Sequence, residues 1–76
     1  MKDMLELIIK SLVEDKDSIS INEIDGEKSV IFEVKVSEND MGKVIGKQGR
    51  VAKAIRTIMK ALAYKEEKKV TIEFIG

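Results

Sequence analysis

The spacing of apolar residues changes between a helical repeat and a strand repeat along the chain, and this change most constrains the fold. Residues 2–15 carry an apolar stripe at the i, i+3, i+4, i+7 and i+8 spacing of one helix face. Residues 18–24 and 29–37 alternate apolar and polar side chains, as strands with one buried face do. An Asp-Gly pair between these two runs favours a tight turn. The sequence therefore predicts a helix followed by a β-hairpin, with Ile31 as an apolar exception on the outer face.

The second half of the chain predicts two further helices and a last strand. A short helix is expected at about residues 38–45, with Ser37 as its N-cap and Asp40 near its positive end. A longer helix is expected at about residues 50–64, and residues 70–75 alternate as a strand. Two helices joined by a short turn thus separate the hairpin from the last strand.

The order of these elements, αββααβ, predicts a small α+β fold. The two helices between the second and third strands form a crossover that is long enough for the third strand to return parallel. Because each strand is apolar on only one face, all three helices are expected to pack there. We expect residues 1–76 to form a single domain, with a three-stranded mixed sheet whose other face is open to water.

The residue types that are absent exclude much enzyme chemistry. The chain has no Cys and no His, so it cannot form a disulfide, a zinc–thiolate site, or a Ser–His or Cys–His pair. We therefore expect a protein that is not an enzyme and that uses no metal, cofactor or small-molecule substrate. No apolar run approaches the roughly 18 residues of a membrane span, and the N-terminal segment lacks the features of a signal peptide. We expect no membrane association and a cytoplasmic location.

The formal net charge of zero hides a basic segment. Residues 1–40 hold eleven acids against five bases, and residues 66–76 hold three acids against two bases. Residues 41–65 hold seven bases and no acid. A charge run is usually just a solvated face, but this one coincides with a glycine-rich turn. The coincidence favours an anion-binding site.

The turn at residues 46–49, with the sequence GKQG, joins the two later helices. Glycines let a ligand approach the main chain, and the free amides at the start of a helix favour an anion. Basic side chains surround the turn: Lys43, Lys47, Arg50 and Lys53. Because this charge extends along the helix, a polyanion backbone fits the site better than one small ion.

Three other interpretations of this turn compete. A nucleotide-binding P-loop requires GxxxxGK[ST], but only three residues separate Gly42 from Gly46, and Gln48 stands where Ser or Thr is needed. That interpretation is excluded. A helix-turn-helix for DNA is possible, since a glycine turn joins two helices, but it requires neither both glycines nor this order of elements. A plain turn between helices explains one glycine, but neither the pair nor the concentration of charge.

The run VIGKQGRVAKAIRTIMKA resembles the V-I-G-x-x-G signature of the KH domain. The order of elements resembles the bacterial type II arrangement of this domain. The chain length and the runs DMGKVIGKQGR and AIRTI are similar to those of the KhpA family of small bacterial KH proteins. The resemblance covers the whole chain and implies that it binds single-stranded RNA, with residues 46–49 as a GxxG loop that clamps the nucleic-acid backbone.

The resemblance also implies roles for individual residues. Backbone amides of the loop and the basic side chains would hold phosphates, while bases would turn towards an apolar floor of Val44, Ile45, Val51 and Ala52. The last strand would lie opposite, with a backbone edge near Ile72 that supplies hydrogen bonds to bases. The RNA-binding set is Lys43, Val44, Ile45, Gly46, Lys47, Gln48, Gly49, Arg50 and Lys53. Of the three aromatic residues, Phe32 and Phe74 are expected to face the core. We therefore expect weak stacking of bases, modest affinity and low sequence specificity.

The predicted helix at residues 50–64 has an apolar arc of roughly 200°, which is wider than packing on a sheet requires. Either the first helix covers the excess, or part of it around Ile58 and Met59 forms a dimer contact. The resemblance implies a homodimer and a heteromer with KhpB, a larger bacterial RNA-binding protein. It further implies an RNA chaperone or post-transcriptional regulator linked to cell-envelope homeostasis and cell length. A pure protein-interaction module is the rival class.

Overall fold

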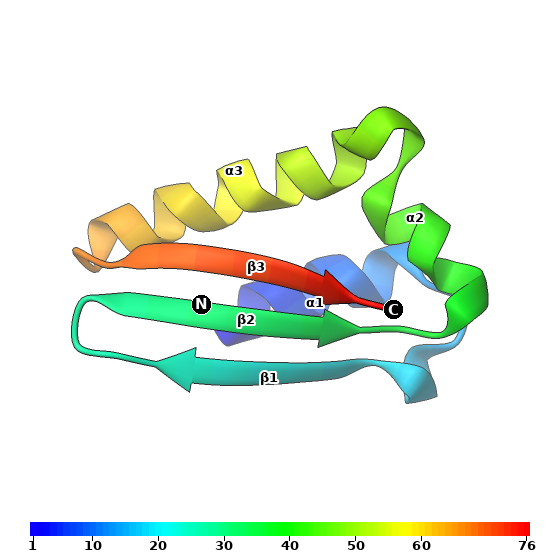
Figure 1. Cartoon of the computed structure of the whole chain (residues 1–76), viewed down its shortest axis with the longest axis horizontal. Coiled ribbons are helices and arrows are strands. Elements are labelled where there is room, and N and C mark those ends of the chain that lie inside the picture. The colour runs from blue at the N-terminus through cyan, green and yellow to red at the C-terminus, as the bar shows by residue number, and fades with distance from the viewer.

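The computed structural model describes residues 1–76 and has the predicted αββααβ order (Figure 1). Three turns of 3₁₀-helix, Lys16–Ser18, Glu38–Asp40 and Lys47–Gly49, connect the main elements. The main elements are α1 (Lys2–Leu12), β1 (Ser20–Asp25), β2 (Ser29–Lys35), α2 (Met41–Ile45), α3 (Arg50–Lys65) and β3 (Lys69–Ile75). No helix is long and apolar enough to cross a membrane.

The three strands form one mixed sheet in the order β1-β2-β3. β1 pairs antiparallel with β2, with Ile24 opposite Ile31, and β3 pairs parallel with β2, with Ile72 beside Phe32. The α2–α3 crossover therefore returns the chain parallel to the strand it left, as predicted. β1 and β3 are the edge strands of the sheet. The outer edge of β3 therefore pairs with no other strand, and α3 runs along that side of the sheet (Figure 1).

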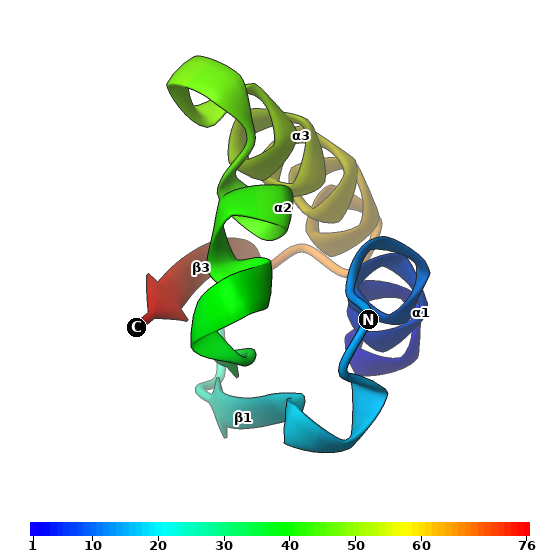
Figure 2. The same ribbon diagram turned by 90° about the vertical axis from the view of Figure 1, so that its right-hand side faces the viewer.

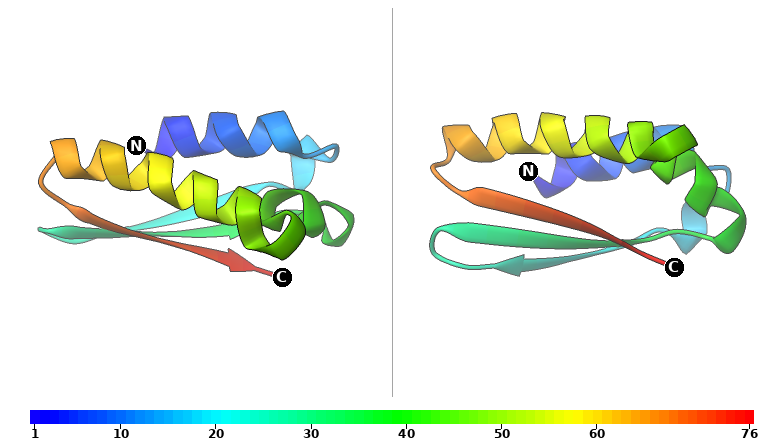
Figure 3. Two further views of the ribbon diagram at one scale, coloured as in Figure 1. Left: turned by 90° about the horizontal axis from the view of Figure 1, so that it is seen from above. Right: turned by 45° about the horizontal axis from the view of Figure 1, so that its top comes forward.

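The core lies between the sheet and the helices on one of its faces. Figure 3 shows α1 and α3 side by side above that face, and Figure 2 shows α2 at the end of the sheet. Alternate residues of β2 are buried, while Ile31 between them is half-buried on the opposite face, as its place in the pattern predicted. The buried cluster consists of Leu5, Ile9, Val13, Val30, Phe32, Val34, Val44, Ile55, Met59 and Ile72.

The excess apolar arc of α3 is largely covered within the chain. Met59 is fully buried in the core, whereas the neighbouring Ile58 keeps 46% of its surface exposed. The prediction of Met59 as a dimer contact is therefore wrong, because its side chain cannot reach a second molecule. Both residues lie on the broad apolar arc of the helix, but helix periodicity alone does not show which part of that arc the core covers.

The end of α1 and the start of α2 differ from the prediction. α1 ends at Leu12, because Val13 adopts an extended backbone and buries its side chain. The predicted helix at residues 38–45 begins as the Glu38–Asp40 3₁₀ turn and becomes α-helical only at Met41. Ser37 occupies the N-cap position of that 3₁₀ turn, but its side chain makes no capping hydrogen bond to the backbone. Its hydroxyl donates instead to the Asp40 carboxylate at 2.9 Å.

Asp40 connects these two regions. It is the one buried charged residue, with 2% of its surface exposed. Its carboxylate accepts the backbone N–H of Glu14 at 3.2 Å and that of Asp15 at 3.0 Å, and the Lys43 ammonium lies at 3.4 Å. The hydrogen bond from the Asp15 amide is the largest cause that lowers the pKa of Asp40 from 3.8 to about 2, against the opposing effect of burial. The ionised carboxylate thus ties the chain after α1 to the segment that begins α2.

This arrangement predicts an acid-sensitive contribution to stability. Because the pKa of Asp40 is lower in the folded state, its contribution is complete above the unfolded pKa and is lost as pH falls from about 4 to about 2. An Asp40→Asn variant, which presents an amide group to two backbone donors, should be less stable than the wild type at pH 6. The stability gap between them should narrow between pH 4 and pH 2, as measured by urea unfolding.

Asp3→Asn is the matched control, since Asp3 is exposed in the first turn of α1. It should leave only a small stability difference throughout the same pH range. A stability difference between the wild type and Asp40→Asn that stays constant down to pH 2 would contradict the role of the ionised carboxylate.

Candidate nucleic-acid interface

The turn between α2 and α3 has a backbone that only glycine adopts readily. Gly46 has φ +78° and ψ 172°, a region essentially restricted to glycine, and Gly49 is left-handed with φ +74°. Gln48 between them is also left-handed, with φ +58°. Three residues with positive φ within four positions bend the chain sharply. Figure 2 shows that the turn projects away from the sheet at the start of α3.

The two glycines of the turn are needed for different reasons. A Cβ on Gly46 would overlap Val51 Cγ2 and would lie 2.8 Å from the Val51 backbone nitrogen, closer than atoms can pack. No atom lies within 4 Å of the position of a Cβ on Gly49, so only its left-handed backbone favours glycine there. Gly42 has neither constraint, since the space around it is open and its backbone is helical.

The four backbone amides of the turn fall into two pairs. The Gly46 amide donates to the Gly42 carbonyl at 2.8 Å, and the Gly49 amide donates to the Gly46 carbonyl at 3.1 Å. Lys47 and Gln48 are the first two residues of the 3₁₀ turn, where helix geometry gives the backbone amides no acceptor within the turn. Of the four loop amides expected to hold phosphate, the glycine amides are thus already engaged. The two central amides, at the start of the 3₁₀ turn, are the ones placed to bind an anion, together with the Lys47 side chain.

The basic side chains around the turn fall into two groups. Lys47, Arg50 and Lys53 are exposed, and none of them forms an ion pair within the chain. Lys43 lies 2.8 Å from a Glu14 carboxylate oxygen and also contacts Asp40. The hydrogen bond with Glu14 raises the pKa of Lys43. Lys43 was predicted to bind phosphate, but the structure shows its charge held by two carboxylates of the chain.

The apolar floor beside the turn is narrower than the sequence suggested. Val44 is fully buried and Ala52 is 2% exposed, so neither side chain can face a ligand. Both belong to the packing under the turn, which corrects their predicted place in a base-binding floor. Ile45 and Val51 are half-buried and provide the apolar surface that remains accessible next to Gly46.

Arg56 occupies the groove between α3 and the free edge of β3, and this site residue was missed in the sequence. Its Nε and Nη2 donate to the Ile72 carbonyl at 3.3 and 3.2 Å, and its Cζ lies 5.4 Å from the centre of the Phe74 ring. The Ile72 carbonyl expected to meet bases is thus already an acceptor within the chain. The sequence does contain a signal for Arg56. This residue lies two helical turns after Gly49, on the same helix face as Lys53, and this helix leads into the parallel strand.

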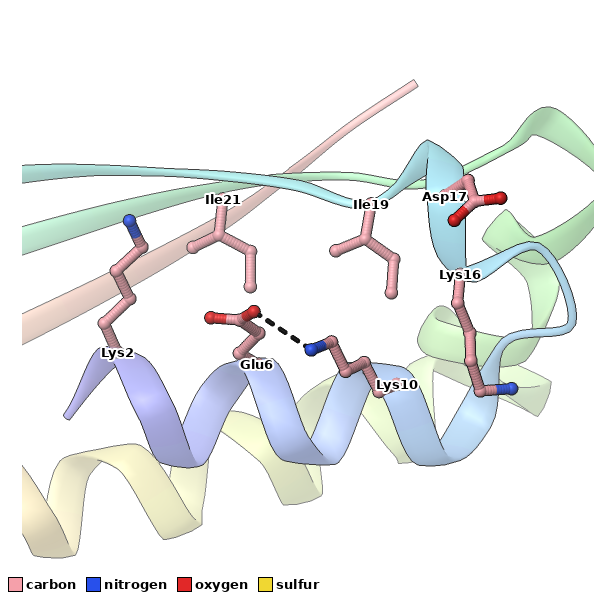
Figure 4. Close-up of a pocket in the computed structure, with 7 residues that line it drawn as sticks. All are labelled: Lys2, Glu6, Lys10, Lys16, Asp17, Ile19 and Ile21. Atoms are coloured by element: carbon pink, nitrogen blue, oxygen red, sulfur yellow. Dashed lines mark ion pairs between the residues drawn. The ribbon is translucent and has the colours of Figure 1, made fainter.

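A second hollow lies between α1 and β1, the strand farthest from β3 in the sheet (Figure 4). Its volume is about 390 Å³, and a Glu6–Lys10 ion pair of 3.2 Å lies within it. The lining consists of Lys2, Glu6, Lys10, Lys16, Asp17, Ile19 and Ile21. Three lysines against two carboxylates leave little excess positive charge, so the glycine turn is the better site for a polyanion.

A pair of glycine substitutions tests the geometry of the turn. Gly46→Ala should destabilise the protein by at least about 1–3 kcal/mol, because it combines a disfavoured backbone conformation with a clash against Val51. Gly42→Ala, four residues earlier, should be neutral or stabilising by up to about 1 kcal/mol, since alanine favours the helix and meets no atom. Denaturant unfolding of both variants measures the difference, and equal stabilities would contradict the close approach of the backbone to Val51.

Comparisons with known proteins place the chain in a family. The sequence model described as "KhpA/KhpB, KH domain" matches residues 2–74. Proteins named RNA-binding protein KhpA are similar along their full length. The one from Clostridium perfringens is 60% identical over 99% of this chain and 100% of its own, and the one from Clostridium acetobutylicum is 59% identical with the same coverage.

A more distant relative, the RNA-binding protein KhpA of Aquifex aeolicus, is 48% identical over 99% of this chain and 95% of its own. No solved structure matches the chain. The relatives are named as RNA-binding proteins and not as enzymes, which agrees with the expectation that the chain is not an enzyme. The chain belongs to the KhpA/KhpB KH-domain family.

Proposed function

We propose that this protein binds single-stranded RNA through the glycine turn and the groove between α3 and β3. The observation that carries the proposal is a projecting glycine turn with Lys47 and Gln48 at its tip, whose amides begin a 3₁₀ turn and have no acceptor within it. Unpaired cations at Lys47, Arg50 and Lys53 surround them. The printed names of the relatives, RNA-binding protein KhpA, support the same ligand.

The phosphate backbone is the part of the RNA that the turn holds. Two adjacent amides and a flexible lysine can bind one phosphate, and Arg50 and Lys53 can reach the next ones along α3. Such contacts position the strand without reading its sequence. The open space beside Gly49, which has no Cβ, lets the strand pass close to the main chain, while Ile45 and Val51 offer an apolar surface to the adjacent base.

The groove beyond the turn is bounded by Arg56 and the edge of β3. Arg56 is exposed on α3 yet anchored on the Ile72 carbonyl, so its guanidinium is held in a fixed plane against which a base can stack. The buried Phe32 and the half-buried Phe74 provide no free ring near the turn. Affinity for a single domain should therefore be modest and specificity low.

The wider role follows the family. We propose that the chain is a single KH domain that acts in the cytoplasm as an RNA chaperone or post-transcriptional regulator, with KhpB as a partner, in control of the cell envelope and cell length. The family description, which joins KhpA and KhpB, supports a shared type of domain. No small-molecule substrate, metal or cofactor enters this function.

A homodimer through the outer surface of α3 and α1 is part of the proposal. Ile58 is 46% exposed, and the adjacent α1 exposes Met4 and 59% of Leu7 (Figure 3). Two linked RNA sites would raise avidity without new contacts to RNA. Sedimentation should show a dimer that Ile58→Lys dissociates, while a wild-type monomer at high concentration would remove this part of the proposal.

The double variant Lys47→Asp/Gln48→Asp tests the RNA site. Two acids at the tip should repel phosphate and weaken the binding of single-stranded RNA about tenfold or more. The slope of log K against log salt concentration should fall in magnitude by about one or more, because at least one phosphate contact is lost. Lys2→Asp/Ser20→Asp is the matched control, because it makes the same change of charge at exposed positions on α1 and β1. Circular dichroism should show both variants folded.

Two outcomes of this titration would contradict the proposal. Undiminished RNA binding by the loop variant would remove the assigned site, and would leave a protein-interaction module as the better function. A preference for duplex DNA over single-stranded RNA, in direct competition, would favour the helix-turn-helix interpretation instead.

A further inference from the structure

Tyr64 is the most exposed large hydrophobic residue of the protein and its only tyrosine. Its side chain is 84% exposed in the last turn of α3, and it makes no hydrogen bond within the chain. Lys53, Arg56, Lys60 and Tyr64 follow one another at spacings of three, four and four residues. They therefore lie along one face of α3, and this face begins at the glycine turn.

Two hollows along α3 and β3 connect this face to Tyr64. The first, of about 210 Å³, lies at Arg56 and Ile72, and the second, of about 320 Å³, lies at Tyr64 and Lys69. Lys60, Val70 and Thr71 line both of them. Because the two hollows share these three residues, they form one groove. We call it the α3–β3 groove, and it leads from the anchored Arg56 to the exposed ring.

The charge along the α3–β3 groove is positive. No acidic residue lines either hollow. Lys60 and Lys69 form no ion pair within the chain, whereas Lys68 is held by Asp25 at 2.7 Å and so fixes the turn after α3. Glu67 lines only the adjoining hollow beyond Tyr64. A free aromatic ring between unpaired lysines is the combination on which single-stranded nucleic acids stack and bind.

We propose that Tyr64, with Lys60 and Lys69, is a second contact region for single-stranded RNA, in which one base stacks on the phenol ring and the lysines hold the flanking phosphates. This inference rests on the proposed function, since it assumes a strand fixed at the glycine turn. Tyr64 lies fifteen residues after Gly49, or about 22 Å along the helix axis. Only a strand long enough to cover that length can contact both regions.

The wild-type protein itself carries a reporter for this contact. With one tyrosine and no tryptophan, its intrinsic fluorescence comes from Tyr64 alone. Oligouridylates of four, six, eight, ten and twelve nucleotides would be titrated, with binding followed separately by the anisotropy of end-labelled RNA. We expect the longer oligonucleotides to quench Tyr64 as they bind, and the tetranucleotide to bind without quenching.

Substitutions at Tyr64 test the energetic part of the inference. Tyr64→Ala should weaken binding of the twelve-nucleotide RNA about fivefold or more, as loss of one stacked base does, and leave the tetranucleotide unaffected. Tyr64→Phe keeps the ring and should bind as the wild type does. Tyr64→Leu keeps apolar bulk without the ring and should resemble Tyr64→Ala.

The outcomes separate this inference from the function on which it rests. If the twelve-nucleotide RNA binds with the same affinity to the wild type and to Tyr64→Ala, and does not quench Tyr64, the second contact region is overturned while the glycine turn stands. If Tyr64→Ala changes self-association and not RNA affinity, the ring belongs to a protein contact and the inference is likewise overturned. If the wild type binds no single-stranded RNA, both proposals fail.

Discussion

The position of the glycine turn depends on one buried carboxylate. Asp40 joins the amides of Glu14 and Asp15, which follow α1, to the hydroxyl of Ser37, which precedes α2. α2 is only five residues long, too short to be stable by itself, so its direction is set by what holds its ends. The Asp40 cluster holds one end, and the contact of Gly46 with Val51 holds the other. The projecting turn is therefore carried on a rigid support.

The same arrangement separates a paired lysine from the unpaired cations, in a chain whose net charge is zero. Lys43 next to the support is paired with Glu14, so it contributes to the fold more than to the field around the turn. The cations beyond it, on the tip and along α3, have no partner in the chain and remain available for phosphate. Acids predominate in the first forty residues, which restricts a polyanion to the side of α3. Local placement, and not net charge, makes the surface suited to RNA.

Periodic patterns predicted what depends on short-range spacing, and missed what depends on contacts between distant segments. Alternation in β2 correctly separated Phe32 from Ile31, and the order of elements led to the parallel pairing of β3. The hydrogen bonds of Asp40 span about 25 residues of sequence, so no local pattern could reveal them or the early end of α1. Val44 and Met59 were placed on the correct helices, but only the packing of α1 and the sheet shows that they are buried.

The central claim is that RNA binds at the Lys47 and Gln48 amides of the glycine turn, and amide NMR spectra test it most directly. In a titration with single-stranded RNA, the Lys47 and Gln48 amides should show the largest shifts, because they lie at the tip and ahead of the first hydrogen bond of the 3₁₀ turn. The Gly46 amide, already bonded to Gly42, should shift less. Shifts confined to the hollow between α1 and β1, with an unchanged turn, would contradict the account.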